Sequence, residues 1–145
     1  MLFLTHLFGG ILGALLFTRI IETQSIILYV FVIIGSLLPD IDHPASKLGK
    51  KVKLIGWIFG HRKSFHSVFL PLVLGMPLIF VSFYLFYAFL FGFLIHLLLD
   101  ALTLKGVMPF YPLNKSVIKG WIKTGSLLEY ILLVLIFVSI IILIF

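Results

Sequence analysis

The chain has 145 residues, of which 62% are apolar and 11% are charged, and its mean hydropathy is +1.28. Soluble domains are about 45–50% apolar and about a quarter charged. This composition therefore excludes a water-soluble domain and predicts a single integral membrane domain over residues 1–145. The absence of cysteine excludes disulfides and thiolate metal sites. We assign the net charge of +6 to loops that face anionic lipid headgroups, and not to nucleic acid binding.

Long apolar runs predict an all-α, polytopic membrane protein with about five transmembrane or membrane-embedded helices in one bundle. Residues 68–99 contain no charge over 32 positions, which is about 48 Å as one helix and too long for a hydrocarbon core of roughly 30 Å. A helical hairpin with its turn near Ser82 fits this run better. The second helix is short and ends at Pro39. The expected helices cover residues 2–18, 26–39, 66–82, 84–102 and 126–145.

Two basic loops, residues 44–63 and 103–124, contain 10 of the 11 Lys and Arg residues. Because loops on the cytoplasmic side of a membrane are enriched in Lys and Arg, we expect both loops and the N-terminus in the cytoplasm. The C-terminus then lies outside the cell membrane. Trp57 and Trp121 lie in these loops, as expected for the membrane interface. Residues 44–63 fit either an amphipathic helix on the membrane surface or a solvated linker.

The ionisable side chains gather at the predicted cytoplasmic face. All five histidines and four of the five acids fall there, and only Glu22 lies at the other face. Ionisable groups at the membrane edge are costly and by default indicate a functional site. Imidazole and carboxylate groups suit one or two divalent ions, with zinc as the first candidate and manganese or iron as alternatives. The candidate ligands are His6, Asp40, Asp42, His43, His61, His66, His96 and Asp100.

The first ligand motif follows Pro39 directly and contains Asp40, Asp42 and His43. An irregular turn after this helix stop could direct two or three of these side chains at one ion. The alternative is a helix-ending turn at the lipid interface.

The second motif is the pair His96 and Asp100, spaced i, i+4 in a segment of Leu and Ile. This spacing places both side chains on one face of a helix, one turn apart. The pair fits a chelating arrangement or a histidine oriented by a carboxylate. A plain buried hydrogen bond is the alternative.

The remaining candidates have mixed interpretations. His61 and His66 flank Arg62, whose guanidinium could bind a phosphate or carboxylate in a bidentate manner. His6 is included as a candidate ligand because it falls at the same membrane face as the other ionisable residues. Glu129 lies one turn into the last helix and could be a ligand, a general base or a charge that complements the helix dipole.

The order and spacing of these motifs also carry a resemblance. The motifs are residues 38–44 (LPDIDHP), residues 60–67 (GHRKSFHS), and His96 with Asp100, Leu102, Thr103 and Gly106. The chain resembles the YdjM family of membrane-bound proteins. This resemblance implies a metal-dependent hydrolase of the inner membrane. The second motif is similar to the family pattern His-Arg-Gly-x-Thr-His-Ser, with Lys63 and Phe65 in place of Gly and Thr. Gly125 and Glu129 also match the family.

We therefore expect a metal-dependent hydrolase that acts on an ester or phosphoester, of a lipid headgroup or a small molecule, at the cytoplasmic face. The metal would lower the pKa of a bound water and polarise the scissile bond. Glu129 or an aspartate such as Asp42 would take the proton, and Arg62 would stabilise developing negative charge. Two other classes stay open, namely a divalent-metal transporter or sensor and a structural protein with a hydrogen-bonded His and Asp plug.

Overall fold

The computed structural model describes residues 1–42 and 66–145, and of Ile41 and Asp42 it describes the backbone only. The described chain is helical and confirms the predicted all-α class with about five helices. The predicted loop at residues 44–63 lies outside the described residues. The helices are α1 (Phe3–Ile20), α2 (Ile26–Leu37), the 3-10 helix η1 (Leu38–Asp42), α4 (Phe69–Ile79), α5 (Phe83–Ala101) and α6 (Leu127–Ile144).

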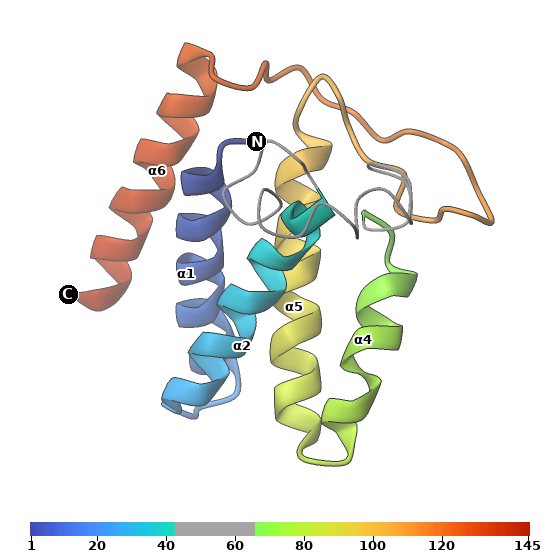
Figure 1. Cartoon of the computed structure of the whole chain (residues 1–145). Coiled ribbons are helices and arrows are strands. Elements are labelled where there is room, and N and C mark those ends of the chain that lie inside the picture. The colour runs from blue at the N-terminus through green and yellow to red at the C-terminus, as the bar shows by residue number, and fades with distance from the viewer. Residues whose placement is uncertain (43–65) are drawn as a thin grey trace.

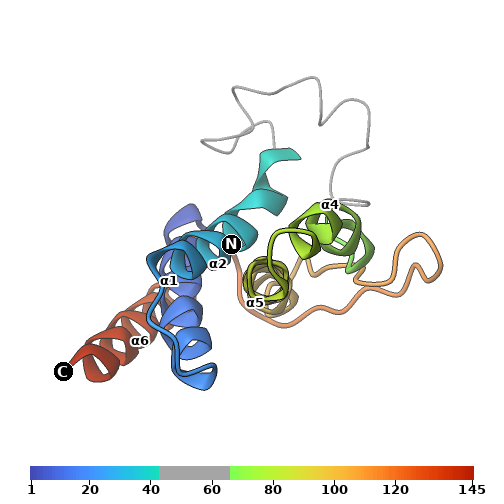
Figure 2. The ribbon, with the colours of Figure 1, turned by 90° about the horizontal axis from the view of Figure 1, so that it is seen from below.

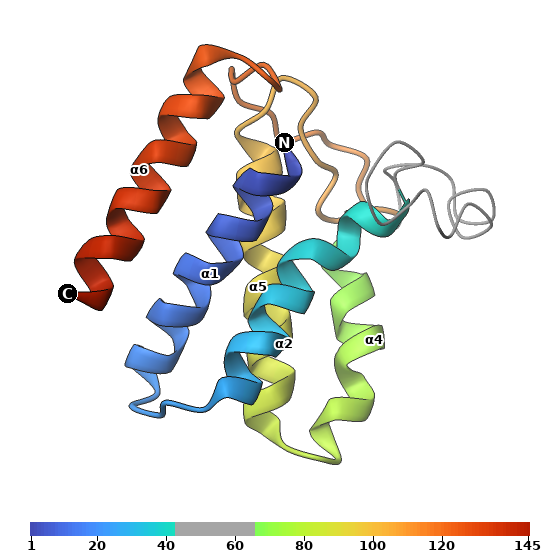
Figure 3. The same cartoon turned by 60° about the vertical axis from the view of Figure 1, so that its left-hand side comes forward.

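The helices run up and down in chain order, so that neighbours in sequence are antiparallel (Figures 1 and 3). Helix α2 packs against both α1 and α5, and α4 packs against α5. Helix α6 lies on the outer side of α1 and away from α4, as the view from below shows (Figure 2). The first and last helices run in the same direction, because Glu129 contacts Leu2 at one end and Arg19 contacts Leu143 at the other.

Three helices are long and apolar enough to cross a membrane, namely α1, α5 and α6. Helices α2 and α4 are apolar but shorter, and η1 extends α2 beyond Pro39. A hairpin turn at Phe80 and Val81 separates α4 from α5, and the Ser82 hydroxyl caps α5 by accepting a hydrogen bond from the Tyr84 N–H. The protein is therefore a multi-pass membrane protein, with most of α6 exposed toward the position of the lipid.

Glycine permits a close contact between α2 and α5. A Cβ atom at Gly92 would lie 1.9 Å from the backbone oxygen of Val32, and one at Gly35 would lie 2.2 Å from the backbone oxygen of Phe89. Both distances are far below van der Waals contact, so only glycine allows the two backbones to approach this closely. The crossing brings the end of α2 next to the last turns of α5.

Helix α1 completes this end of the bundle. A Cβ atom at Gly10 would lie 2.1 Å from the Ser36 hydroxyl oxygen, so glycine again allows close approach. The Ser36 hydroxyl lies 2.9 Å from the Ile33 carbonyl oxygen and 3.3 Å from that of His6. This contact fixes the first turn of α1 beside the end of α2.

The segment between α5 and α6 is irregular but internally paired. Val107 and Ile118 exchange two backbone hydrogen bonds of 2.9 Å, and Leu104 N–H donates to the Ile122 carbonyl at 3.0 Å. The Val68 N–H donates to the Pro109 carbonyl at 2.8 Å, which ties the start of α4 to this segment. The segment thereby holds residues 66–68 against the end of the bundle.

Candidate metal site

Five predicted ligands meet at one end of the bundle although they come from four separate segments. His6 lies in the first turn of α1, Asp40 on η1, His66 in the turn before α4, and His96 and Asp100 near the end of α5. Four of them are buried and Asp40 is half-buried. Local sequence explains these positions in part, because Pro39 cannot donate the next hydrogen bond of α2, and the chain continues as the 3-10 helix η1, which carries Asp40.

Asp100 lies at the centre of the site. Its Oδ1 atom is 3.3 Å from Nε2 of His6 and 2.5 Å from the amino group of Met1. Its Oδ2 atom is 3.5 Å from Nε2 of His66 and 3.8 Å from Nε2 of His96. One buried carboxylate therefore faces three imidazoles.

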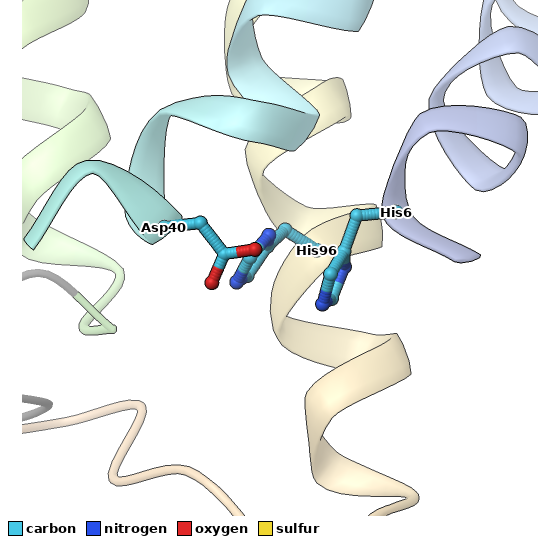
Figure 4. Close-up of side chains that lie close together, drawn as sticks. All are labelled: His6, Asp40 and His96. Carbon is cyan, nitrogen blue, oxygen red and sulfur yellow. The ribbon is translucent and has the colours of Figure 1, made fainter. Parts of the chain in front are cut away.

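The three imidazole rings lie against one another. The rings of His6 and His96 are stacked, with centroids 3.9 Å apart and planes 13° from parallel. Figure 4 shows them side by side, with the Asp40 carboxylate next to them. The Nε2 atoms of His66 and His96 are 3.4 Å apart. The ring edges thus converge on a small volume that also contains the carboxylates.

These donors form two overlapping groups that could hold a metal ion. The groups are His6, Asp40 and His96, and His66, His96 and Asp100, and within each the possible ligand atoms lie within 4.8 Å of one another.

Burial makes this donor set unusual for a purely structural cluster. The Nδ1 atom of His6 is buried without a hydrogen bond, and Nε2 has only the carboxylate of Asp100, at 3.3 Å. Buried polar atoms are nearly always hydrogen-bonded, so a cation that accepts nitrogen and oxygen ligands fits this arrangement. The buried His and Asp side chains could therefore hold a divalent metal ion.

Glu129 is fully buried but lies in neither group. Its Oε1 atom accepts hydrogen bonds from the Leu2 N–H at 2.6 Å and from the Thr5 hydroxyl at 3.2 Å. Its Oε2 atom accepts one from the Gly125 N–H at 2.6 Å. Glu129 therefore anchors the first turn of α1, which carries His6, to the start of α6.

The other predicted site residues lie outside the part of the chain whose side chains the structure describes. They are Asp42, His43, His61 and Arg62. Their roles as ligands or catalytic groups remain predictions.

Sequence analysis missed one contact at the site. The carbonyl oxygen of Ser36 lies 2.8 Å from Nδ1 of His96, and both residues are fully buried. The sequence signal for this contact is Pro39, because a proline three residues after a carbonyl cannot donate the 3-10 hydrogen bond to it. The residue that orients His96 is thus a backbone group, which a search for ionisable side chains cannot find.

A bundle of apolar helices with buried His and Asp side chains at one end defines a multi-pass membrane protein with a candidate metal site. The family model described as YdjM inner membrane protein matches residues 1–145, and the chain belongs to the YdjM family. This confirms the resemblance found in the motifs.

Individual relatives agree with this assignment. The chain is 30% identical over 139 residues to the uncharacterized protein YvsG of Bacillus subtilis (strain 168), covering 89% of this chain and 85% of that protein. It is 35% identical over 99 residues to the inner membrane proteins YdjM of Escherichia coli (strain K12) and Shigella flexneri, covering 55% of this chain and 46% of each of those proteins. No solved structure matches the chain significantly.

Replacing Glu129 by glutamine is expected to destabilise the fold by about 2–3 kcal/mol, since it leaves buried donors unpaired. Both carboxylate oxygens accept a backbone N–H, from Leu2 and Gly125. An amide in either orientation therefore places its NH2 group against an N–H. Thermal unfolding of the detergent-purified protein measures the effect. Ser139→Ala, which removes an exposed hydroxyl from the same helix, is the control. Equal stability of Glu129→Gln and the wild type would show that these hydrogen bonds contribute little.

Proposed function

We propose that this protein is a membrane-embedded, metal-dependent hydrolase that cleaves an ester or phosphoester at the end of the bundle that carries the His and Asp cluster. The observation that carries the proposal is the convergence of three imidazoles on one buried carboxylate, with the Nδ1 atom of His6 lacking a hydrogen bond. Burying these polar and ionisable groups costs free energy unless they bind a ligand that pairs with them.

The residues that would hold the ion are His6, Asp40, His66, His96 and Asp100. Zinc is the first candidate, because histidine and carboxylate ligands are typical of catalytic zinc sites, and manganese and iron are the alternatives. A bound divalent ion supplies Lewis acidity and activates water at neutral pH.

The candidate ligands differ in their access to solvent, and this supports different roles for them in binding the ion and in proton transfer. Asp40 is half-buried whereas the other four donors are buried. A carboxylate on the open side of the site suits proton transfer from a water molecule that attacks the substrate. We extend the proposal to Asp42 as a second acid or base and to Arg62 as the group that binds developing negative charge. The hydrogen bonds of Glu129 favour an anchoring role, and a role in proton transfer remains the alternative.

The substrate class follows from the surroundings of the site. The segment from Thr103 to Lys123 begins just after Asp100 and carries four exposed lysines, together with Trp121, which is 78% exposed. Basic and aromatic side chains together are typical of the cytoplasmic membrane interface. We therefore propose that this end, with the N-terminus, faces the cytoplasm and that an anionic lipid headgroup is the substrate.

Hydrolysis assays on detergent-purified protein test the proposal. The substrates are nitrophenyl esters, nitrophenyl phosphodiesters and anionic phospholipid in mixed micelles, each with and without a chelator. We expect turnover that the chelator abolishes and that added Zn²⁺, Mn²⁺ or Fe²⁺ restores. Asp100→Asn should lose this turnover, whereas Glu22→Gln, at the opposite end of the bundle, should keep it. Turnover that the chelator does not affect would contradict the mechanism.

A further inference from the structure

The two groups of candidate ligands share one residue, His96. We propose that His96 binds a divalent ion through Nε2 alone, because the Ser36 carbonyl holds its other nitrogen, so that an ion that completes one of the described groups excludes an ion that completes the other. This inference rests on the proposed metal site and assigns the ligand atom at its centre.

The Nδ1 atom of His96 is committed to the backbone. It lies 2.8 Å from the Ser36 carbonyl oxygen, and the ring is fully buried. A carbonyl oxygen can only accept a hydrogen bond, so Nδ1 carries the hydrogen and Nε2 carries the lone pair. A carbonyl partner on one ring nitrogen is a common way to fix the tautomer of a metal-binding histidine.

Pro39 removes one N–H that could compete with His96 for the Ser36 carbonyl. In an α-helix the N–H of residue 39 would donate to the Gly35 carbonyl, and in a 3-10 helix it would donate to that of Ser36. Proline has no N–H and can do neither. The residue that ends α2 therefore also removes one competing donor from the carbonyl that contacts His96.

The Nε2 atom of His96 faces the donors of the site. It lies 3.4 Å from Nε2 of His66 and 3.8 Å from Oδ2 of Asp100. An imidazole can bridge two ions only if both of its nitrogens are free of hydrogen. With Nδ1 held by Ser36, an ion that completes one group takes the nitrogen that the other group needs.

An ion bound by His66, His96 and Asp100 leaves His6 and Asp40 without the nitrogen that completes their group. His96 is therefore the ligand common to both described arrangements.

Two measurements test the inference independently of each other. The first is the Zn²⁺ content of the detergent-purified full chain after equilibrium dialysis, measured by elemental analysis. We expect bound Zn²⁺ in the wild type and a lower content in His96→Gln. An unchanged Zn²⁺ content in His96→Gln would overturn the inference and leave the proposed metal site standing, whereas no bound ion in the wild type would overturn both.

The second measurement uses metal-free protein labelled with ¹⁵N-histidine, with the His96 signals assigned by their loss in His96→Gln. Two-bond ¹H–¹⁵N correlation spectra distinguish a protonated Nδ1 from a protonated Nε2. We expect His96 to carry its hydrogen on Nδ1. A hydrogen on Nε2 alone would overturn the inference whatever the metal content.

Discussion

Replacing His96 by glutamine is expected to lower the affinity of the protein for Zn²⁺ by about 100-fold or more. Loss of a group that only orients a ligand already costs 10–100-fold in affinity, and His96 is itself a ligand in both candidate groups. Glutamine keeps much of the side-chain length but offers an amide in place of the imidazole nitrogen. Competition with a chromophoric chelator measures the change.

Two matched variants show whether the loss is specific to the shared ligand. His66→Gln removes a donor of one group only, so its loss of affinity should be smaller than that of His96→Gln. Glu22→Gln changes an acid at the far end of α1 and should leave affinity unchanged. Circular dichroism verifies that each variant remains helical. Wild-type affinity in His96→Gln would refute the assignment of this ring.

The second large effect concerns the scaffold. Gly92→Ala is expected to destabilise the protein by about 3 kcal/mol, at the upper end of the range for overpacked positions. The added Cβ atom would lie 1.9 Å from the Val32 backbone oxygen, which cannot move without displacing α2. Helices α2 and α5 would have to separate, and with them the Ser36 carbonyl and the His96 ring. Thermal unfolding and Zn²⁺ affinity should therefore fall together.

A substitution on the lipid-facing side of the same helix provides the control. Leu98 is 65% exposed, so Leu98→Ala should change the unfolding temperature far less than Gly92→Ala. If Gly92→Ala unfolds at the wild-type temperature, the close crossing of α2 and α5 does not hold the bundle together.

The helical architecture could be predicted from the sequence because the bilayer imposes a simple rule. A spanning helix must be long and apolar, so the run at residues 68–99 predicts a hairpin, and the structure places its turn at Phe80 and Val81. The crossing at Gly35 and Gly92 was not predicted. It depends on how two helix faces meet in space, and a single glycine in a helix does not indicate which backbone it faces.

The residues of the candidate site could be predicted from the sequence, but the contacts that hold them could not. With so few ionisable residues in the chain, their common position at the helix ends predicts that His6, Asp40, His66, His96 and Asp100 gather together. The sequence left the role of Glu129 open among three interpretations. Its partners Leu2 and Thr5 lie more than 120 residues away, and contacts of such separation leave no trace in local spacing. The contact of the Ser36 carbonyl with His96 could not be predicted, because every residue has a backbone carbonyl.

The central claim is that imidazole and carboxylate groups at one end of this bundle bind a divalent ion. X-ray absorption spectroscopy of the zinc-loaded protein at the zinc edge tests it most directly. We expect the multiple-scattering pattern of at least two imidazole ligands together with oxygen ligands, and weaker imidazole scattering in His96→Gln. A zinc shell made of oxygen atoms alone would contradict the claim.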